Sequence, residues 1–215
     1  MERQDKGLAW MLQYENIAWY EEGAVRILDR RIYPIEVTKV ECRTHREVAE
    51  AIKDMVTQSA GPYVAASMGM ALAAYECRGK TAEEQISYLE DAAYTISHAR
   101  PTTTWRMQKV TESCIEEAKR LLGVGGEETA DTYAVSSACA ADGGSPGAAA
   151  RGDISDALRD FAVEQNNERY FRIGKVGHHL ATLFPEHGAV MTQCFGETIV
   201  GMMLREAKSL GKDRS

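Results

Sequence analysis

Apolar and polar positions alternate in short runs near the start of the chain. Residues 17–20 and 24–28 are mainly apolar, and the polar segment Glu21-Glu22-Gly23 lies between them. A period of two is typical of half-buried strands, and a short polar link that contains glycine is typical of a hairpin turn. Residues 36–42 alternate again. The pattern predicts a small antiparallel sheet of three strands, with an exposed turn between the first two.

Helical patterns begin directly after this sheet. Thr44 is a candidate N-cap, and Glu47 would complete a capping box with it. The pattern then runs to a break at Gly61-Pro62. The side chains expected on the apolar face of this helix are Val48, Ile52, Met55 and Val56.

Three further helices are predicted before the chain becomes low in complexity. Residues 63–75 carry small side chains on nearly every side, which indicates close packing within a helical core. Thr81 is a candidate N-cap for an amphipathic helix that runs to about Ile96. Residues 105–122 form a long helical pattern that ends at Gly123.

The second half of the chain has a different pattern. Residues 138–152 are rich in Ala, Gly and Ser, which predicts a flexible loop or insertion, and residues 154–172 are helical in pattern. We interpret Ala189-Val190-Met191-Thr192 as a short strand that leads through a loop into an amphipathic helix as far as Leu210. A strand, a loop and a helix in that order are the first step of a parallel α/β sheet.

Composition and charge exclude several classes of protein. Hydrophobic residues make up 44% of the chain and charged residues 27%, which is typical of a folded globular protein. The net charge is −7, and no run of Lys or Arg is longer than a pair, so a nucleic-acid surface is not expected. No apolar stretch reaches the roughly 20 residues of a membrane helix, and the N-terminus does not resemble a leader peptide. We therefore expect a cytoplasmic protein that binds neither nucleic acid nor membrane.

One thiol has a position that suits chemistry. The five cysteines are too widely spaced for a paired zinc motif or a disulfide framework. Cys194 lies between the predicted strand and the next helix, where α/β proteins bind ligands and where a helix dipole lowers a thiol pKa. A buried, inert thiol remains the alternative. The adjacent His178 and His179 would diverge on a helix, so we interpret them as a core and a surface histidine and expect no metal site.

Two loops could hold an anion. Arg100 precedes a proline and three threonines at a helix start, and its guanidinium together with hydroxyl and N–H groups would suit a phosphate. An exposed arginine before a capped helix explains the same residues. The loop Gln58-Ser59-Ala60-Gly61-Pro62 also opens a helix and could receive an anion, although an interhelical turn explains it equally well. Glu197 is interpreted as an acid stabilised by the dipole at a helix start.

Several of these segments, taken in order, resemble one enzyme family. The hairpin Trp19 to Arg31 with Tyr33-Pro34, the helix–loop–helix Val48 to Ala74, Ala99 to Thr102, and Thr192-Gln193-Cys194 are similar to motifs of the methylthioribose-1-phosphate isomerases. That family also includes ribose-1,5-bisphosphate isomerases and the regulatory subunits of the translation-initiation exchange factor. The resemblance covers nearly the whole chain.

The resemblance implies an α/β fold in two domains with a site between them. Residues 1–136 would form a helical N-terminal domain with a small leading antiparallel sheet, residues 137–152 the flexible loop or insertion, and residues 153–215 a connecting helix and the start of a Rossmann-like parallel α/β domain. It also implies a dimer without metal or nicotinamide cofactor that converts a 5-substituted ribose 1-phosphate to the ribulose 1-phosphate. Cys194 would be the catalytic thiol, and the substrate-binding residues would be Arg100, Gln58, Ser59, Gly61, Thr102 and Glu197.

The chain also departs from the family pattern. Gln58 or Ser59 stands where the family loop has arginine, Gln193 replaces a histidine, and Glu197 brings a charge near the thiol. The second catalytic residue of the family, an aspartate, would lie downstream of Lys212. We therefore expect that activity needs a downstream segment or a complementary C-terminal half. The alternative is a non-catalytic subunit that senses a sugar phosphate or nucleotide.

Overall fold

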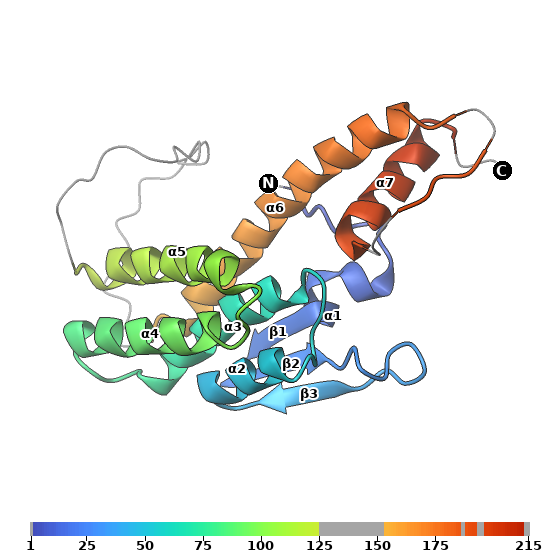
Figure 1. Cartoon of the computed structure of the whole chain (residues 1–215). Coiled ribbons are helices and arrows are strands. Elements are labelled where there is room, and N and C mark those ends of the chain that lie inside the picture. Colours follow the sequence, from blue (N-terminus) through green and yellow to red (C-terminus); the bar gives the residue numbers. More distant parts are fainter. Residues whose placement is uncertain (1, 125–152, 186–187, 193–195, 213–215) are drawn as a thin grey trace.

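A computed structural model describes residues 2–124, 153–185, 188–192 and 196–212 (Figure 1). Helices pack on one face of a small sheet, and a long helix leads away from this core to a second helix near the C-terminus. The elements are η1 (Trp10–Leu12), α1 (Tyr14–Ile17), β1 (Ala18–Glu21), β2 (Ala24–Leu28), β3 (Lys39–Cys42), α2 (His45–Lys53), α3 (Gly61–Glu76), α4 (Ala82–Ser97), α5 (Thr104–Leu122), α6 (Ser155–Thr182) and α7 (Glu197–Ser209).

The predicted antiparallel sheet is confirmed. Its strands follow the order β1-β2-β3, and Glu22 and Gly23 form the hairpin turn with φ of 50° and 75°. Positive φ at both turn residues suits the right-handed twist of a hairpin. The third strand is shorter than predicted because its pairing with β2 ends where Leu28 faces Lys39.

The helix after the sheet begins as predicted and ends early. Thr44 and Glu47 form both hydrogen bonds of the capping box. The helix stops at Lys53, so the prediction that Met55 lies on its apolar face is wrong: Met55 has a φ of 61° and is 41% exposed. Gly61-Pro62 forms the first turn of α3, where proline needs no N–H partner.

Helix α3 is the centre of the core. Nearly all of its side chains are buried, which confirms the prediction for residues 63–75. A Cβ atom on Gly69 would lie 3.0 Å from Val48 of α2 and 3.0 Å from Ile96 of α4, so both helices approach α3 closely there. The predicted N-cap at Thr81 and the helix end at Gly123, with a φ of 67°, are also confirmed.

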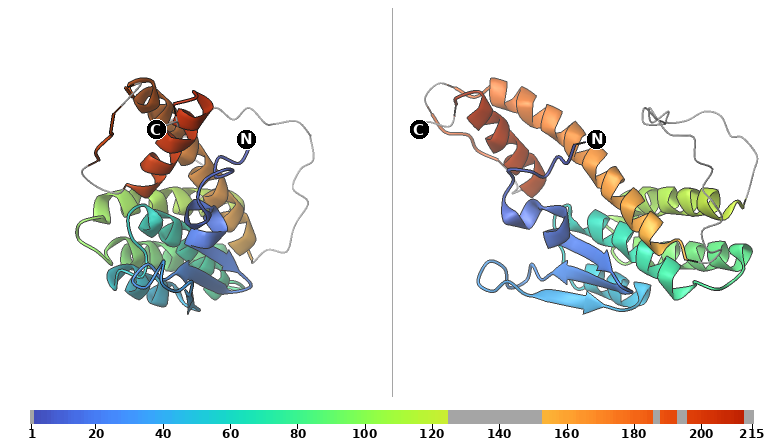
Figure 2. Two further views of the ribbon diagram at one scale, coloured as in Figure 1. Left: turned by 90° about the vertical axis from the view of Figure 1, so that its right-hand side faces the viewer. Right: turned by 180° about the vertical axis from the view of Figure 1, so that it is seen from behind.

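The C-terminal part is a pair of packed helices (Figure 2). Helix α6 continues past the predicted residues 154–172 to Thr182, and its first half belongs to the core around α3. A Cβ atom on Gly177 would lie 3.0 Å from backbone atoms of Met202 and Met203 in α7. His178 and His179 are both exposed, so the interpretation of one as a core residue is wrong.

The predicted strand at 189–192 is not formed. These residues are exposed, with Met191 at 96%, and the only sheet of the described residues is the antiparallel one. A strand needs neighbours for its backbone hydrogen bonds, and no described strand lies beside this segment. The segment 137–152, predicted to be a flexible loop, lies outside the described residues. Among the described helices, none is long and apolar enough to cross a membrane.

Candidate anion-binding site

The first turn of α3 forms one wall of a small pocket. Gly61 is buried there, and a Cβ atom at this position would overlap the side-chain hydroxyl of Thr57. Ser59, with a φ of 58°, gives the preceding loop a left-handed residue. The loop is therefore tight, and only glycine fits at the start of the helix without displacing its neighbour.

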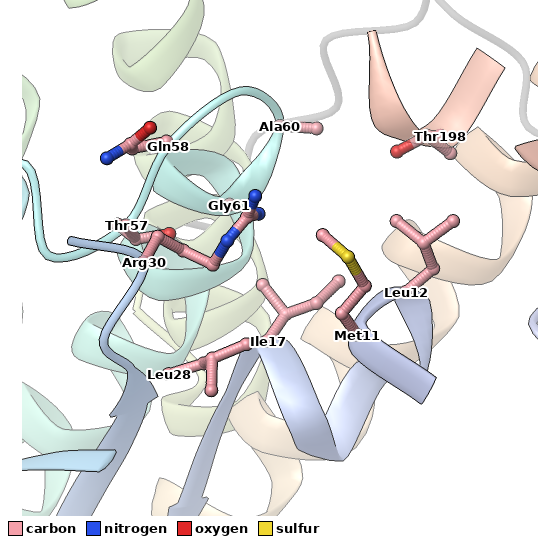
Figure 3. Close-up of a pocket in the computed structure, with 10 residues that line it drawn as sticks. All are labelled: Met11, Leu12, Ile17, Leu28, Arg30, Thr57, Gln58, Ala60, Gly61 and Thr198. Atoms are coloured by element: carbon pink, nitrogen blue, oxygen red, sulfur yellow. The ribbon is translucent and has the colours of Figure 1, made fainter. Parts of the chain in front are cut away.

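The pocket lies between segments that are distant in the sequence (Figure 3). The side chain of Arg30, which follows β2, extends toward Gly61, and Thr198 of α7 lies on the opposite side. The cavity volume is about 10 Å³, which is room for about one water molecule. The lining residues are Met11, Leu12, Ile17, Leu28, Arg30, Thr57, Gln58, Ala60, Gly61 and Thr198.

Three features make this pocket favourable for an anion. Gly61 and Thr198 belong to the first turns of α3 and α7, where the helix dipole is positive, and neither helix has a side-chain N-cap. Arg30 adds a guanidinium. None of the residues that line the pocket is acidic. Helix N-termini with a nearby arginine are a common way to bind phosphate.

A wider hollow shares the first turn of α3. Tyr63, two residues after Gly61, lines it together with Thr102, Thr103, Trp105 and Arg106, and its volume is about 290 Å³. The sequence-predicted residue Thr102 is thereby brought beside the helix start that the predicted loop opens.

Arg100 lies two residues before Thr102, which lines this hollow. Its backbone carbonyl accepts hydrogen bonds from the hydroxyls of Thr103 and Thr104, at 3.4 and 3.0 Å. These two hydroxyls therefore stabilise the start of α5. The Arg100 side chain is half-buried and forms no ion pair with any described residue. It remains available to an anion.

The predicted site residues are only partly brought together. Gln58 and Gly61 line the small pocket, although the Gln58 amide donates to the Met55 carbonyl at 3.4 Å, while Ser59 is exposed and does not line it. Glu197 is the first residue of α7. Cys194 lies outside the described residues.

The described cysteines are unsuited to be nucleophiles. Cys42, Cys77 and Cys114 are buried, and burial raises the pKa of their thiols to about 11, 11 and 12. A thiol is a weak nucleophile when it stays protonated at neutral pH. Cys139, like Cys194, lies outside the described residues. Within the described parts of the chain, no group of His, Cys, Asp and Glu side chains could hold a metal ion.

Sequence reasoning missed Arg30 as a site residue. Arg30 and Arg31 follow the same strand, but Arg31 pairs with Asp29 at 2.7 Å, whereas Arg30 extends into the pocket. The sequence signal for Arg30 was weak, because it consists only of a cationic residue directly after a buried strand. Only the packing of the Gly61 turn and α7 against this strand end reveals its position.

Solved structures define the class of fold. The chain matches the 5-methylthioribose 1-phosphate isomerase of Pyrococcus horikoshii OT3 with a TM-score of 0.54, over 89% of this chain and 49% of that one. It matches the translation initiation factor eIF-2B subunit delta from A. fulgidus with a TM-score of 0.59, over 90% and 51%. Both are 19% identical to it. The fold is therefore one that isomerases and translation-factor subunits share.

Sequence comparison confirms the resemblance to one family within this class. The chain is 29% identical over 181 residues to the methylthioribose-1-phosphate isomerase of Roseiflexus castenholzii, covering 82% of this chain and 44% of that protein. It is 35% identical over 100 residues to the isomerase of Caldanaerobacter subterraneus, covering 43% and 29%. No family model matches. The chain is a relative of the methylthioribose-1-phosphate isomerases and spans less than half of their length.

Proposed function

We propose that this chain provides the phosphate-binding part of an aldose–ketose isomerase that acts on a 5-substituted ribose 1-phosphate. The observation that carries the proposal is the pocket at α3, where Arg30 and the first turns of two helices meet without an acidic lining residue. The relatives supply the reaction class, since they are named methylthioribose-1-phosphate isomerases.

The reaction is internally balanced. The ring oxygen leaves C1 and takes up a proton, while the phosphate stays on C1. Hydrogen is then transferred from C2 to C1 and the C2 hydroxyl releases a proton, which balances the proton taken up by the ring oxygen, so that C2 is oxidised to a ketone and C1 is reduced by the same amount. The protein has to supply an acid for the ring oxygen, a group that manages the hydrogen and a pocket that excludes water. No external oxidant or reductant is needed.

The site residues divide into two groups in this proposal. Arg30 and Arg100 would hold the phosphate, with Gly61 and Thr102 providing the helix start and a hydroxyl beside it. Cys194 would act at C1 and C2, because it precedes α7, whose first turn lines the pocket. The remaining candidates near the sugar are Gln58, Ser59 and Glu197.

The small volume of the pocket bears on how substrate enters. About 10 Å³ cannot hold a phosphate, so α7 or the Arg30 side chain has to shift when ligand binds. Helix α7 is the better candidate because it meets the α3 end of the pocket through one lining residue, Thr198. We propose that the parallel α/β domain, a homodimer or a complementary C-terminal half completes the site, in a cytoplasmic enzyme of methionine salvage.

The test is a direct assay of isomerisation. We expect 5-methylthioribose 1-phosphate to be converted to the ketose, followed by NMR, by the protein purified from its native cells with any companion chain. Cys194→Ala is expected to abolish conversion without weakening sugar-phosphate binding. Cys42→Ala, which changes a buried thiol in the sheet, is the control and should remain active.

The outcomes separate the two functions that the fold supports. Binding of the sugar phosphate with no ketose in any preparation would reject the isomerase and favour the non-catalytic sensing subunit. Conversion that survives in Cys194→Ala would reject the assigned thiol. Absence of both binding and conversion would reject the site itself.

A further inference from the structure

Arg169 on α6 is a cation without a counter-ion among the described residues. The residue as a whole is half-buried, but its Nε and Nη2 atoms are inaccessible to solvent and donate no hydrogen bond to any described residue. Burial lowers the pKa of this guanidinium below its ordinary value. An arginine nevertheless keeps its charge, so the fold encloses a positive charge that nothing described here neutralises.

This situation is unusual within the chain. Acidic residues outnumber basic ones, 32 to 25, and several other arginines have carboxylate partners. Arg3 pairs with Asp5, and Arg172, one turn after Arg169 on the same helix, pairs with Glu168 at 2.9 Å. Buried donors without acceptors cost free energy, and more so when they are charged. The unpaired state of Arg169 is therefore not explained by a shortage of acidic residues in the chain.

The neighbours of Arg169 connect it to both hollows at α3. Its guanidinium carbon lies 5.9 Å from the ring centre of Tyr63, which lines the wider hollow. It lies 5.2 Å from the ring of Tyr170, whose hydroxyl donates to the carbonyl of Leu12, and Leu12 lines the small pocket. The Tyr63 ring therefore places the cation near the first turn of α3.

We propose that Arg169 binds the anionic group of the ligand at the first turn of α3, and that a phosphate there completes its hydrogen bonds. This inference rests on the proposed function for the identity of the anion, the phosphate of a sugar phosphate. It adds a residue from α6 to a site that otherwise consists of Arg30, the α3 turn and the Arg100 segment. Three segments far apart in the sequence then supply guanidinium groups to one anion.

The experiment uses inorganic phosphate as the probe and residues 1–215 as the protein. Phosphate is titrated while the midpoint of thermal unfolding and the heat of binding are recorded. Arg169→Met keeps the approximate volume and removes the charge. Arg172→Met is the matched control, because its side chain is 71% exposed and already paired. Arg169→Lys tests whether a charge alone restores binding.

We expect phosphate to raise the unfolding midpoint of the wild type and of Arg172→Met equally. In Arg169→Met the affinity should fall roughly tenfold or more, the loss expected for one charge-assisted hydrogen bond. Arg169→Lys should recover part of it. Without phosphate, Arg169→Met should unfold at the same or a higher temperature than the wild type, because an uncompensated buried charge has been removed.

Several results would overturn the proposal. One is that Arg169→Met and the wild type bind phosphate with equal affinity. Another is that the unfolding midpoint of the wild type does not respond to phosphate. If Arg169→Met does not fold, the Nε resonance of Arg169 is followed by NMR in the wild type. It should shift on phosphate addition, and an unchanged resonance rejects the assignment. Phosphate binding that depends on Arg169 in a protein without isomerase activity would reject the proposed function alone.

Discussion

Two neighbouring arginines have different surroundings at the end of β2. Arg31 donates to both carboxylate oxygens of Asp29, and this ion pair raises its pKa. Arg30 instead extends beside the buried Gly61 turn. Position within the fold, and not residue type, therefore separates a residue of the candidate site from a surface ion pair.

The Arg30 assignment leads to a matched test. Arg30→Gln should weaken binding of a sugar phosphate about tenfold, which corresponds to the loss of one charge-assisted contact. Arg31→Gln alters the adjacent position and should change the affinity by less than about twofold. Isothermal titration with ribose 1-phosphate measures both. Equal affinities in the two variants would show that Arg30 does not contact the anion.

At the scale of elements, local sequence signals control where helices begin and end. The two capping boxes, at Thr44–Glu47 and Thr81–Glu84, are both fully formed. Helix α5 ends at the left-handed Gly123, as a glycine C-cap requires. Helix α2 ends earlier than its apolar pattern suggests, because the chain turns at Met55 to bring Val56 into the core.

The capping box of α4 gives a prediction about stability. Thr81→Ala removes the hydroxyl that accepts from the Glu84 N–H and should lower the free energy of unfolding by about 1 kcal/mol. Thr95→Ala on the same helix is the control, since its hydroxyl donates only to the carbonyl of Asp91 within the helix. Urea denaturation should show little loss there. Equal losses in both variants would contradict the capping role.

The contact between α6 and α7 depends on a residue without a side chain. At Gly177 the backbone of α7 comes so near that a Cβ atom would lie 3.0 Å from it. Gly177→Ala should therefore separate the helices and increase amide exchange throughout α7, while α3 keeps its protection. Gly174→Ala is the milder control, because its Cβ atom would meet the end of the Arg205 side chain at 3.4 Å. Unchanged exchange in α7 after Gly177→Ala would show that the helices are loosely packed.

On the scale of the whole molecule, the N-terminal segment joins the core to the C-terminal helices. The backbone N–H of Gln4 donates to Asn167 of α6, and its carbonyl accepts from Arg205 of α7, both at 2.8 Å. Arg3 donates to Asp5 and to Glu15. Figure 2 shows this segment beside α6 and α7. The segment thus links α6 and α7, and the first turn of α7 lines the candidate pocket.

This segment predicts how stability depends on pH. Burial acts to raise the pKa of Asp5, but hydrogen bonds from Arg3 and from the Tyr14 N–H outweigh it and hold the pKa below its ordinary value. The unfolded chain then takes up the proton more readily, so the stabilising contribution is present above about pH 4 and is lost as pH falls through the folded pKa.

Urea denaturation between pH 7 and pH 2.5 provides the measurement. The wild type should lose stability steeply below about pH 4. Asp5→Asn should be less stable at neutral pH and show a smaller loss on acidification. Asp160→Asn, at a position where the side chain is 70% exposed, serves as the control and should follow the wild-type curve. A parallel curve for Asp5→Asn would exclude Asp5 as the source of the acid sensitivity.

The sequence alone determined the elements that depend on near neighbours. The hairpin turn at Glu22-Gly23, the N-caps Thr44 and Thr81 and the small-residue helix were predictable, because the interactions that form them join residues within a few positions of each other. The strand prediction at 189–192 was wrong for the same reason: a strand requires distant partners that a local pattern does not contain.

Only the tertiary structure determined which side chains of the candidate site lie close together. Arg30, Gly61 and Thr198 come together from segments far apart in the chain, and Arg169 of α6 lies beside the rings of Tyr63 of α3 and of its own neighbour Tyr170. Such contacts depend on how helices pack, which a pattern of periodicity does not record. The residues of the predicted loops, Arg100 among them, were therefore recognisable from the sequence, whereas Arg30 and Arg169 became candidates only in the folded structure.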